Sequence, residues 1–310
     1  MLYIGGKETT HTFLRIATVI SNALANTSVP NSAIQLVTTR ADISSLLSFD
    51  QYIDLVIPRG SSDLVRHIKS NTKIPVLGHA DGLCNIYLTD SADGRMAVNV
   101  ILDAKLDYPA ACNAVDTLLV DEAALTALPQ VASALLERGV SLRCDEHSRA
   151  ALSSSLSASQ AAILQSATEE DWETEFLGPT LAIKTIRNPP SCPPSTAAAT
   201  SCALAIAHIN AHSSHHTDAI LTSSRDLAEQ FQRGVDSACV FWNASTRMAD
   251  GMRFGFGTEV GISTSKIHAR GPVGLEGLTI YKYLIDGNGQ GAGEYGEGEG
   301  KRTFKHERIL

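Results

Sequence analysis

The chain has 310 residues, enough for roughly two domains with a sizeable core. Its 25 Lys and Arg residues against 33 Asp and Glu residues give a formal charge of −8, without a long basic run. These features argue against a nucleic-acid partner or an anionic membrane surface. No leader pattern follows Met1, and no apolar run approaches the length of a membrane span.

The six cysteines are scattered and form no CxxC pair. This usage is typical of cytosolic thiols and indicates neither a disulfide framework nor a zinc site. We therefore expect a cytoplasmic protein.

Strands alternate with helices from the first residues, a pattern that predicts a parallel α/β sheet. The expected strands here cover 1–4, 34–38, 53–57 and 74–77, and the expected helices follow Gly5-Gly6, span 42–48 and carry Leu64, Val65 and Ile68. A doubly wound nucleotide-binding sheet normally has further strands before this point. We therefore expect an N-terminally shortened form of something longer.

The alternation continues along the rest of the chain. Expected strands cover 86–88, 117–120, 140–144, 181–186, 219–222 and 239–243, and expected helices run from a cap at Asp90 or Ser91 towards Lys105 and over 122–138, 203–212 and 224–234. The segment 148–167 is weakly patterned, and 187–201, with two Pro-Pro pairs, predicts a loop. Residues 287–300 hold seven glycines and predict a flexible tail.

Cys112 lies in a turn after Pro109 and just before the strand expected over 117–120. Such a position can expose a thiol to a cleft, and the thiolate form is a nucleophile. A buried structural cysteine is the more common alternative.

The turn Gly60-Ser61 joins an expected strand to an expected helix. Small residues there leave backbone N–H groups at a helix N-terminus, where a dinucleotide phosphate can bind. An ordinary turn with a serine cap is the more common alternative.

Two further groups could carry chemistry. His208, His212, His215 and His216 are dense enough to suggest metal binding, with Asp218 the only nearby carboxylate, but helix-end and exposed histidines are the more frequent explanation. We predict no metal. Glu173 and Glu175 lie two residues apart and share a face only in a strand.

The last third is rich in glycine and polar side chains between aromatic residues, over 240–247, 251–257 and 263–274. Such segments suit a polar cavity for an anionic substrate. A glycine-rich surface loop is the alternative.

Long motifs in this chain strongly resemble gamma-glutamyl phosphate reductase, also called glutamate-5-semialdehyde dehydrogenase, of the aldehyde dehydrogenase superfamily, and look most like its fungal members. The motifs are HADGLCNIYL at 79–88, YPAACNAVDTLLV at 108–120, HINAHSSHHTDAI at 208–220 and the stretch WNASTRMADG to GPVGLEGL over 242–278. The resemblance implies an aldehyde dehydrogenase-like α/β fold, with a truncated dinucleotide-binding sheet and a complete catalytic domain. It implies a cofactor-domain remnant over 1–78, a catalytic domain over 79–270, and a C-terminal strand and flexible tail over 271–310.

The resemblance also implies an activity, in which NADPH reduces L-glutamyl 5-phosphate to L-glutamate 5-semialdehyde and phosphate in proline biosynthesis. Cys112 matches the catalytic thiol, which would form a thioester. Gly78 stands where hydrolytic relatives carry a glutamate base, so water would not intercept that thioester. The other implied site residues are Gly60, Ser61 and Glu175 for the cofactor and Asn243, Ser245, Arg247, His268 and Arg270 for the substrate.

Partners and departures follow from the same resemblance. We expect a homo-oligomer, with 278–285 as a strand that could pair across subunits, and glutamate 5-kinase as a candidate partner. Relatives carry on the order of 100 further residues before Met1, and Ile4 replaces a basic residue. The alternatives are an inactive fragment or an incomplete gene model that acts at most as an interaction partner, and a hydrolytic semialdehyde dehydrogenase.

Overall fold

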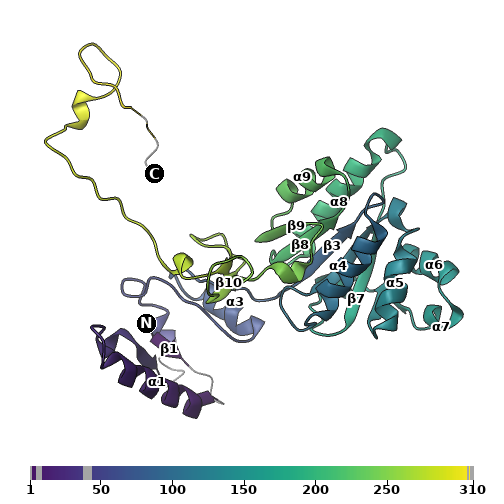
Figure 1. The fold of residues 1–310 in the computed structure, drawn as a ribbon, viewed down its shortest axis with the longest axis horizontal. Helices are drawn as coiled ribbons and strands as arrows, with labels where there is room; N and C mark the ends of the chain where they lie inside the picture. Colours follow the sequence, from purple (N-terminus) through teal and green to yellow (C-terminus); the bar gives the residue numbers. More distant parts are fainter. Residues whose placement is uncertain (1, 5–8, 38–43, 306, 308–310) are drawn as a thin grey trace.

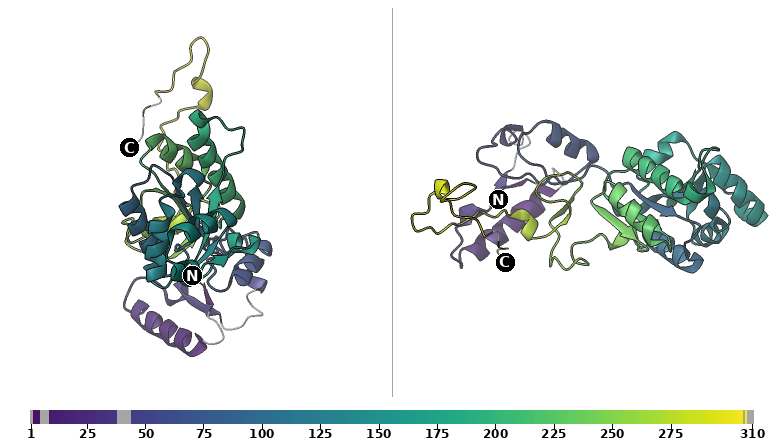
Figure 2. Two further views of the ribbon diagram at one scale, coloured as in Figure 1. Left: turned by 90° about the vertical axis from the view of Figure 1, so that its right-hand side faces the viewer. Right: turned by 90° about the horizontal axis from the view of Figure 1, so that it is seen from above.

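The computed structural model describes residues 2–4, 9–37, 44–305 and 307. It consists of a large body built on a seven-stranded sheet, a smaller body, and a C-terminal tail that extends away from both (Figures 1 and 2). None of the described helices is long and apolar enough to cross a membrane.

The large sheet is entirely parallel, as the alternating sequence predicts, with strand order β6-β5-β7-β4-β3-β8-β9. Its strands are β3 (Cys84–Leu88), β4 (Val115–Asp121), β5 (Ser141–Cys144), β6 (Gln165–Ser166), β7 (Thr180–Ile186), β8 (Thr217–Leu221) and β9 (Cys239–Trp242). Every residue of β3, β4 and β8 is buried. Strands buried on both faces read as nearly continuous apolar runs, which is why the sequence revealed them.

Helices cover both faces of this sheet and make three layers (Figure 1). Because side chains alternate along a strand, Leu118 faces one apolar core and Leu119 the other. The helices are α4 (Gly94–Leu106), α5 (Leu128–Glu137), α6 (Glu146–Ser155) and α7 (Ala158–Ala161), then α8 (Ala197–His212) and α9 (Arg225–Gly234). The first core packs against α4 to α6 and the second against α8 and α9.

Several predicted boundaries in this body are wrong. Helix α4 is capped by Asp93, not by Asp90 or Ser91, because the Asp93 carboxylate accepts the Met96 N–H at 2.7 Å. The segment 148–167, for which the weak pattern predicted no element, contains most of α6 and all of α7. The predicted loop 187–201 stops short, since Pro194 opens a 3-10 turn that leads into α8 at Ala197. The helix predicted over 122–138 is split into a 3-10 turn and α5.

Strands β3 and β4 pair with one irregularity. Cys84 pairs with Val115 and Asn85 with Thr117, so Asp116 is an extra residue on β4, a β-bulge. The Asp116 carboxylate forms a buried ion pair with Lys105 at 3.1 Å and accepts the Phe176 N–H at 3.2 Å. The bulge is therefore fixed by its own side chain.

The smaller body holds less regular structure. Its elements are β1 (Leu2–Ile4), α1 (Thr10–Leu24), β2 (Gln35–Val37), α3 (Ser62–Ser70), β10 (Gly261–Ser263) and β11 (Gly271–Val273). Strands β1 and β2 pair in parallel, and β10 and β11 form an antiparallel hairpin. The strands predicted over 53–57 and 74–77 shrink to a single bridge between Val56 and Val76, because Pro75 has no N–H to donate to a ladder.

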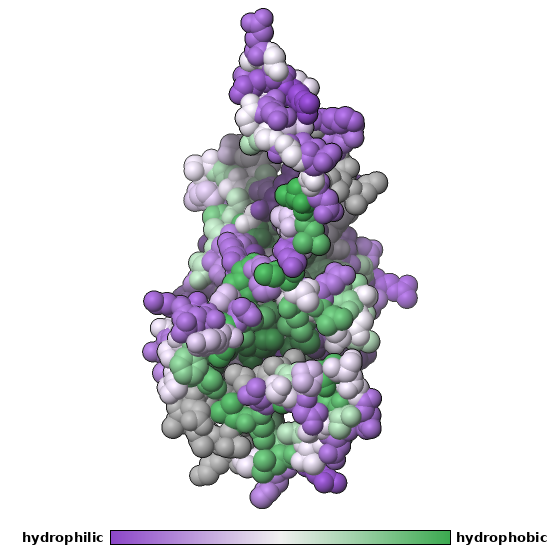
Figure 3. Space-filling model, turned by 90° about the vertical axis from the view of Figure 1, so that its left-hand side faces the viewer, coloured by the Kyte–Doolittle hydropathy of each residue, from purple (hydrophilic) through white to green (hydrophobic). Residues whose placement is uncertain are grey.

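Helix α1 leaves much of its apolar surface exposed. It has no buried residue, and Leu14, Ile16 and Val19 are 45 to 56% exposed. Figure 3 shows apolar surface gathered on this side of the molecule.

The strand predicted over 278–285 is absent from the described residues. Ile280 and Ile285 are 84 and 89% exposed, and no neighbouring strand offers backbone partners there. The Gly5-Gly6 turn and the first residues of the helix predicted over 42–48 lie outside the described residues, as does residue 38, the end of the strand predicted over 34–38. The three predicted domain boundaries remain predictions.

Candidate functional site

Four residues with chemically useful side chains lie just before four strands of the sheet. His79 precedes β3, Cys112 precedes β4, Glu175 precedes β7, and His216 directly precedes β8. In a parallel sheet the amino ends of the strands share one edge. The topology therefore collects these side chains at the edge that faces the smaller body.

Cys112 is half-buried and held by a close backbone contact with Gly82. A Cβ on Gly82 would lie 2.3 Å from the Cys112 carbonyl oxygen, so only glycine fits there. Burial first, then the charges of Glu175 and Glu259, raise the pKa of the Cys112 thiol to about 11. The thiol is therefore protonated at neutral pH in this state.

Two imidazoles stand beside this thiol. One ring nitrogen of His79, one of His216 and the Cys112 Sγ all lie within 4.8 Å of one another. The rings meet edge to face with centroids 5.1 Å apart. Burial lowers the pKa of both histidines, that of His216 to about 3, so both rings are neutral at physiological pH.

Glu175 belongs to the same neighbourhood. Burial raises its carboxyl pKa, opposed by a hydrogen bond from the Gly82 backbone. The next residue, Phe176, donates its N–H to Asp116 and stacks under Lys105, whose Nζ lies 5.9 Å from the ring centroid. The buried ion pair of the bulge thus positions the Glu175 loop next to Cys112.

Gly60 lines a cavity of about 90 Å³ that also contacts His79 and Ile262. Gly60 has a φ of +155°, and a Cβ there would meet Leu64 Cδ2 at 2.7 Å, so the turn requires glycine. Ser61 does not line the cavity; its hydroxyl caps α3 by accepting the Leu64 N–H at 3.4 Å. The serine-cap alternative therefore describes Ser61, while Gly60 faces the site.

Arg59 lies at the same turn and was not singled out by the sequence. It lines the cavity, and its positive charge acts on both His79 and Cys112. It is exposed, and among the described residues no carboxylate lies within ion-pair distance of its guanidinium. It is a cation available for a ligand.

Asn243 and Ser245 have local structural partners. The Asn243 side chain accepts the Thr222 N–H and donates to the Thr222 carbonyl, both at 2.9 Å, while its backbone has a φ of +54°. Ser245 caps the short 3-10 helix that begins at Thr246. Both brace the ends of β8 and β9, and their predicted contact with substrate remains a prediction.

Arg247 approaches the site through Asn113, the residue after Cys112. Its guanidinium donates to the Asn113 side-chain oxygen and to Asp107, whose carboxylate lies 3.3 Å away. Asn113 in turn donates to the Ala249 carbonyl at 2.9 Å. Arg247 is thus committed to holding the Cys112 turn.

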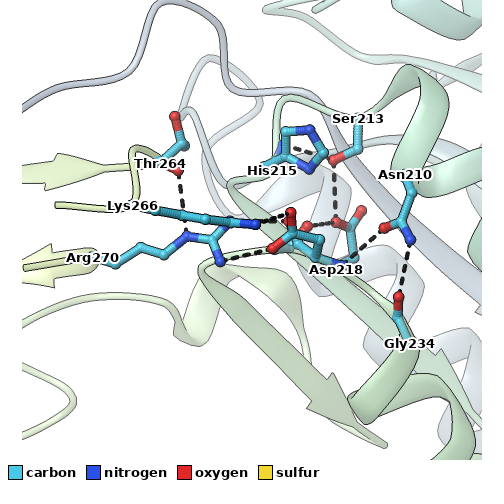
Figure 4. A network of polar contacts seen from close by, with 10 residues as sticks. Asn210, Ser213, His215, Asp218, Gly234, Thr264, Lys266 and Arg270 are labelled. Carbon is cyan, nitrogen blue, oxygen red and sulfur yellow. Dashed lines mark hydrogen bonds and ion pairs between the residues drawn. The ribbon is translucent and has the colours of Figure 1, made fainter.

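Arg270 and His268 lie on the β10–β11 hairpin. Arg270 and Lys266 clamp Asp236, at 3.0 and 2.6 Å, and so fasten the hairpin to the loop before β9 (Figure 4). These partners, with the Lys266 hydrogen bond contributing most, lower the pKa of Asp236. His268 is exposed and contacts the Gly277 carbonyl at 2.9 Å. The structure brings neither residue to Cys112.

The four clustered histidines of the sequence do not come together. The rings of His208 and His212 lie with their centroids 4.5 Å apart and their planes tilted by 35°, and His212 contacts Glu173 at 3.0 Å. Asp218 is buried, and its carboxylate accepts hydrogen bonds from Asn85, Ser213 and Ser237 (part of this network is seen in Figure 4). His216 alone turns towards Cys112.

Sequence reasoning missed His79, Gly82 and Arg59, and it considered His216 only as one member of a local histidine cluster. Their shared signal is position, since each precedes a strand or helix whose amino end faces the site. That signal becomes visible only once the strand order is known.

None of the family models compared with the chain matches it. A probable aldehyde dehydrogenase from Listeria monocytogenes superimposes with a TM-score of 0.62 at 16% identity, over 92% of this chain and 69% of that one. The chain has an aldehyde dehydrogenase-like fold, which confirms the predicted fold class.

Similarity to one kind of protein with this fold is much higher. A gamma-glutamyl phosphate reductase from Thermotoga maritima superimposes with a TM-score of 0.83 at 37% identity, over 93% of this chain and 65% of that one. A probable gamma-glutamyl phosphate reductase of Schizosaccharomyces pombe is 52% identical over 98% of this chain and 64% of its own length. Over nearly its whole length the chain is therefore similar to gamma-glutamyl phosphate reductases. It spans just under two thirds of the length of these relatives.

Proposed function

We propose that this chain carries the thiol chemistry of a gamma-glutamyl phosphate reductase: reduction of L-glutamyl 5-phosphate to L-glutamate 5-semialdehyde and phosphate, in cytoplasmic proline biosynthesis. The observation that carries this proposal is the position of Cys112, half-buried beside two neutral imidazoles, Glu175 and a free guanidinium. The high identity to named reductases supports the proposed substrate class. Self-association and contact with glutamate 5-kinase belong to the same proposal.

The reaction begins at the Cys112 sulfur. The thiol proton passes to an imidazole of His79 or His216, whose ring nitrogens lie within 4.8 Å of Sγ. The sulfur attacks the acyl carbon, the carbon–oxygen bond to phosphate breaks, and phosphate leaves with the bonding pair. Arg59 receives the departing phosphate charge, because its guanidinium lines the adjacent cavity and is unpaired among the described residues.

The thioester on Cys112 must then escape water. Gly78 provides no base where a hydrolytic enzyme would need one, and the cavity beside it, at about 90 Å³, holds few waters. A hydride at the thioester carbon gives a thiohemiacetal, which collapses to the aldehyde and returns the proton to Sγ. The chain thereby regenerates its own thiol.

NADPH would supply that hydride when bound. The residues present fit its anionic part: the Gly60 turn has a backbone conformation that suits glycine, and it leads directly into the N-terminus of α3. The cavity of about 90 Å³ is far smaller than the roughly 300 Å³ of a typical small-molecule pocket. Glu175, next to Cys112, is the residue we propose to hold the nicotinamide ribose.

The reverse reaction tests the proposal: semialdehyde oxidation with NADP⁺, followed by absorbance, with and without phosphate. We expect turnover that requires phosphate and is lost in Cys112→Ala, with the fold retained by circular dichroism. Turnover without phosphate would instead identify a hydrolytic dehydrogenase. Appreciable activity of Cys112→Ala would remove Cys112 from its role.

Arg59→Gln is the matched test of the phosphate position. We expect the KM for phosphate to rise about tenfold, with a smaller change in kcat. Arg66→Gln is the control, since Arg66 is nearby on α3 but already pairs with Asp63 and Asp81. An equal effect of the two variants would contradict the assignment.

A second candidate function is a non-catalytic partner of other subunits. The exposed apolar surface of α1 favours it. Isothermal titration with NADPH separates the two, because a reductase must release binding heat at millimolar cofactor and a non-catalytic partner need not.

A further inference from the structure

The cluster of His79, Cys112 and His216 has the composition of a metal site. Each residue offers one ligand atom, and all three atoms lie within 4.8 Å of one another. In a tetrahedral zinc site with bonds of 2.0 to 2.3 Å, ligand atoms are roughly 3.3 to 3.6 Å apart. The three side chains therefore need only about an ångström of closure around a cation.

The free atoms of both imidazoles can be assigned from their other contacts. The His79 Nδ1 contacts the Ile262 carbonyl at 3.2 Å, and because a carbonyl only accepts, this nitrogen carries the proton. The lone pair of His79 is then on Nε2. A ligating histidine commonly donates its second ring N–H to a backbone carbonyl in this way.

His216 provides an independent observation. Its side chain is 1% exposed, its Nδ1 contacts the Thr217 hydroxyl at 2.8 Å, and its Nε2 is buried without a hydrogen-bond partner among the described residues. A buried polar nitrogen without a partner is costly and calls for a ligand. The ring is packed against His79, in the cluster that holds the Cys112 sulfur.

The charges around the cluster favour a cation. Glu175 and Glu259 act on Cys112, and Asp81 acts on His79. Arg59 opposes them at both residues, and Lys69 at His79. Three carboxylates thus face two cations.

We propose that His79, Cys112 and His216 bind one thiophilic divalent cation, Zn²⁺ above all, through two imidazole nitrogens and one thiolate. On binding, the sulfur–hydrogen bond breaks, the proton leaves to solvent, and the sulfur lone pair forms the bond to the metal. Two nitrogens and one sulfur leave the fourth tetrahedral position open. Resting on the proposed function, a consequence is that the bound cation occupies the nucleophile and blocks turnover reversibly.

Cobalt(II) is the probe, because it reports thiolate ligation by absorbance. Titration of the full, untagged, reduced chain should saturate at one Co²⁺ per chain, with a sulfur-to-cobalt charge-transfer band that Zn²⁺ displaces. Cys112→Ser should remove the band, and His79→Gln and His216→Gln should each weaken binding at least about tenfold. If buried His216→Gln fails to fold, His79→Gln and Cys112→Ser decide the result.

Two control variants match the cluster elsewhere in the chain. His212→Gln removes one ring of the other close imidazole pair, and Cys239→Ser removes another half-buried thiol. Both should leave the band and the affinity unchanged. A band that survives in Cys112→Ser, or an affinity unchanged by both cluster histidines, would overturn the site.

A second readout needs no enzyme activity. Zn²⁺ should slow the alkylation of Cys112, measured by mass spectrometry, and a chelator should restore it. Protection of Cys112 in a chain that shows no turnover even when freed of metal would retain the cation site and refute the reductase function. Phosphate-dependent turnover of a chain in which Zn²⁺ does not protect Cys112 would support the reductase function and refute the cation site.

Discussion

The two bodies of this molecule differ in how completely they bury their elements. In the large body, helices cover both faces of the sheet and Leu118 and Leu119 are fully buried. In the smaller body, α1 has no buried residue and the paired segments near Val56 and Val76 share a single bridge. An apolar element is therefore buried where neighbouring strands and helices cover it, and apolar sequence alone does not ensure burial.

The site follows this difference. Cys112 and His216 are fixed by the amino ends of β4 and β8, whereas Gly60 and Arg59 belong to the sparsely packed side. The proposed nucleophile therefore has a rigid support, while the turn proposed to face phosphate is free to adjust when a ligand binds.

The largest expected effect tests that contrast directly. Leu118→Ala leaves a cavity in the sheet core and should lower the free energy of unfolding by about 2 to 5 kcal/mol. Leu14→Ala on α1, where the side chain is 45% exposed, should cost less than about 1 kcal/mol. Denaturant unfolding followed by tryptophan fluorescence reports on the large body, which holds both Trp172 and Trp242. Equal losses in the two variants would erase the distinction.

A substitution of Gly82, at the edge of the site, tests how firmly the Cys112 turn is held. Gly82→Ala would place a methyl group against the Cys112 backbone, and should cost about 1 to 3 kcal/mol and reduce turnover on the order of 100-fold. Gly293→Ala, where an added Cβ meets nothing within 4 Å, should change neither quantity. Full turnover in Gly82→Ala would show that the Cys112 turn tolerates displacement.

Loss of the connection between the two bodies should have a smaller effect. Asp236→Asn loses the clamp on Lys266 and Arg270, and hydrogen exchange in β10 and β11 should become about two- to fivefold faster. The pKa of Asp236 is lowered in the folded chain, so its contribution is present above its unfolded pKa near 3.9 and is lost as the pH falls through the folded value. The unmodified chain should therefore show the same acceleration, corrected for intrinsic rate, only below about pH 4. Exchange in Asp236→Asn equal to the unmodified chain at pH 7 would rule out the clamp.

The smallest effect is expected for the tail. Truncation after Leu278 should leave the melting temperature within about 1 °C, because the apolar side chains at 280–285 are at least 80% exposed. Differential scanning calorimetry measures it. A drop of several degrees would mean that the tail packs against one of the bodies.

The fold of the large body was readable because its central strands β3, β4 and β8 are buried on both faces and alternate with helices. The strands expected over 117–120 and 181–186 are confirmed within β4 and β7. Errors arose where one residue changes the local rule: Pro194 permits a helix to begin where a proline-rich loop was expected, and Asp93 outcompetes two earlier caps. The segment 278–285 forms no strand in the single chain, where none of the described strands offers it backbone partners, and its pairing across subunits stays a prediction.

The site was harder to predict than the fold. Cys112 and Glu175 were proposed from the family motifs, and the structure places both at Gly82, which contacts the Cys112 backbone and hydrogen-bonds Glu175. His79 and His216 could not be paired from spacing, because metal-type spacing rules apply within one local segment and these residues meet only through the strand order. Arg270 looked like an anion binder by composition, yet its guanidinium is taken by Asp236.

The bulge at Asp116 sets the length of the chain segment that carries Cys112. One residue of strand spans about 3.3 Å, so deleting Asp116 would pull Cys112 towards the sheet by that distance relative to the arm that carries His79. The same deletion would leave the buried Lys105 ammonium without its ion-pair partner. It would also remove the hydrogen bond from the Phe176 N–H that holds the loop of Glu175. The single extra residue Asp116 therefore sets the spacing that keeps Cys112, His79 and Glu175 close to one another.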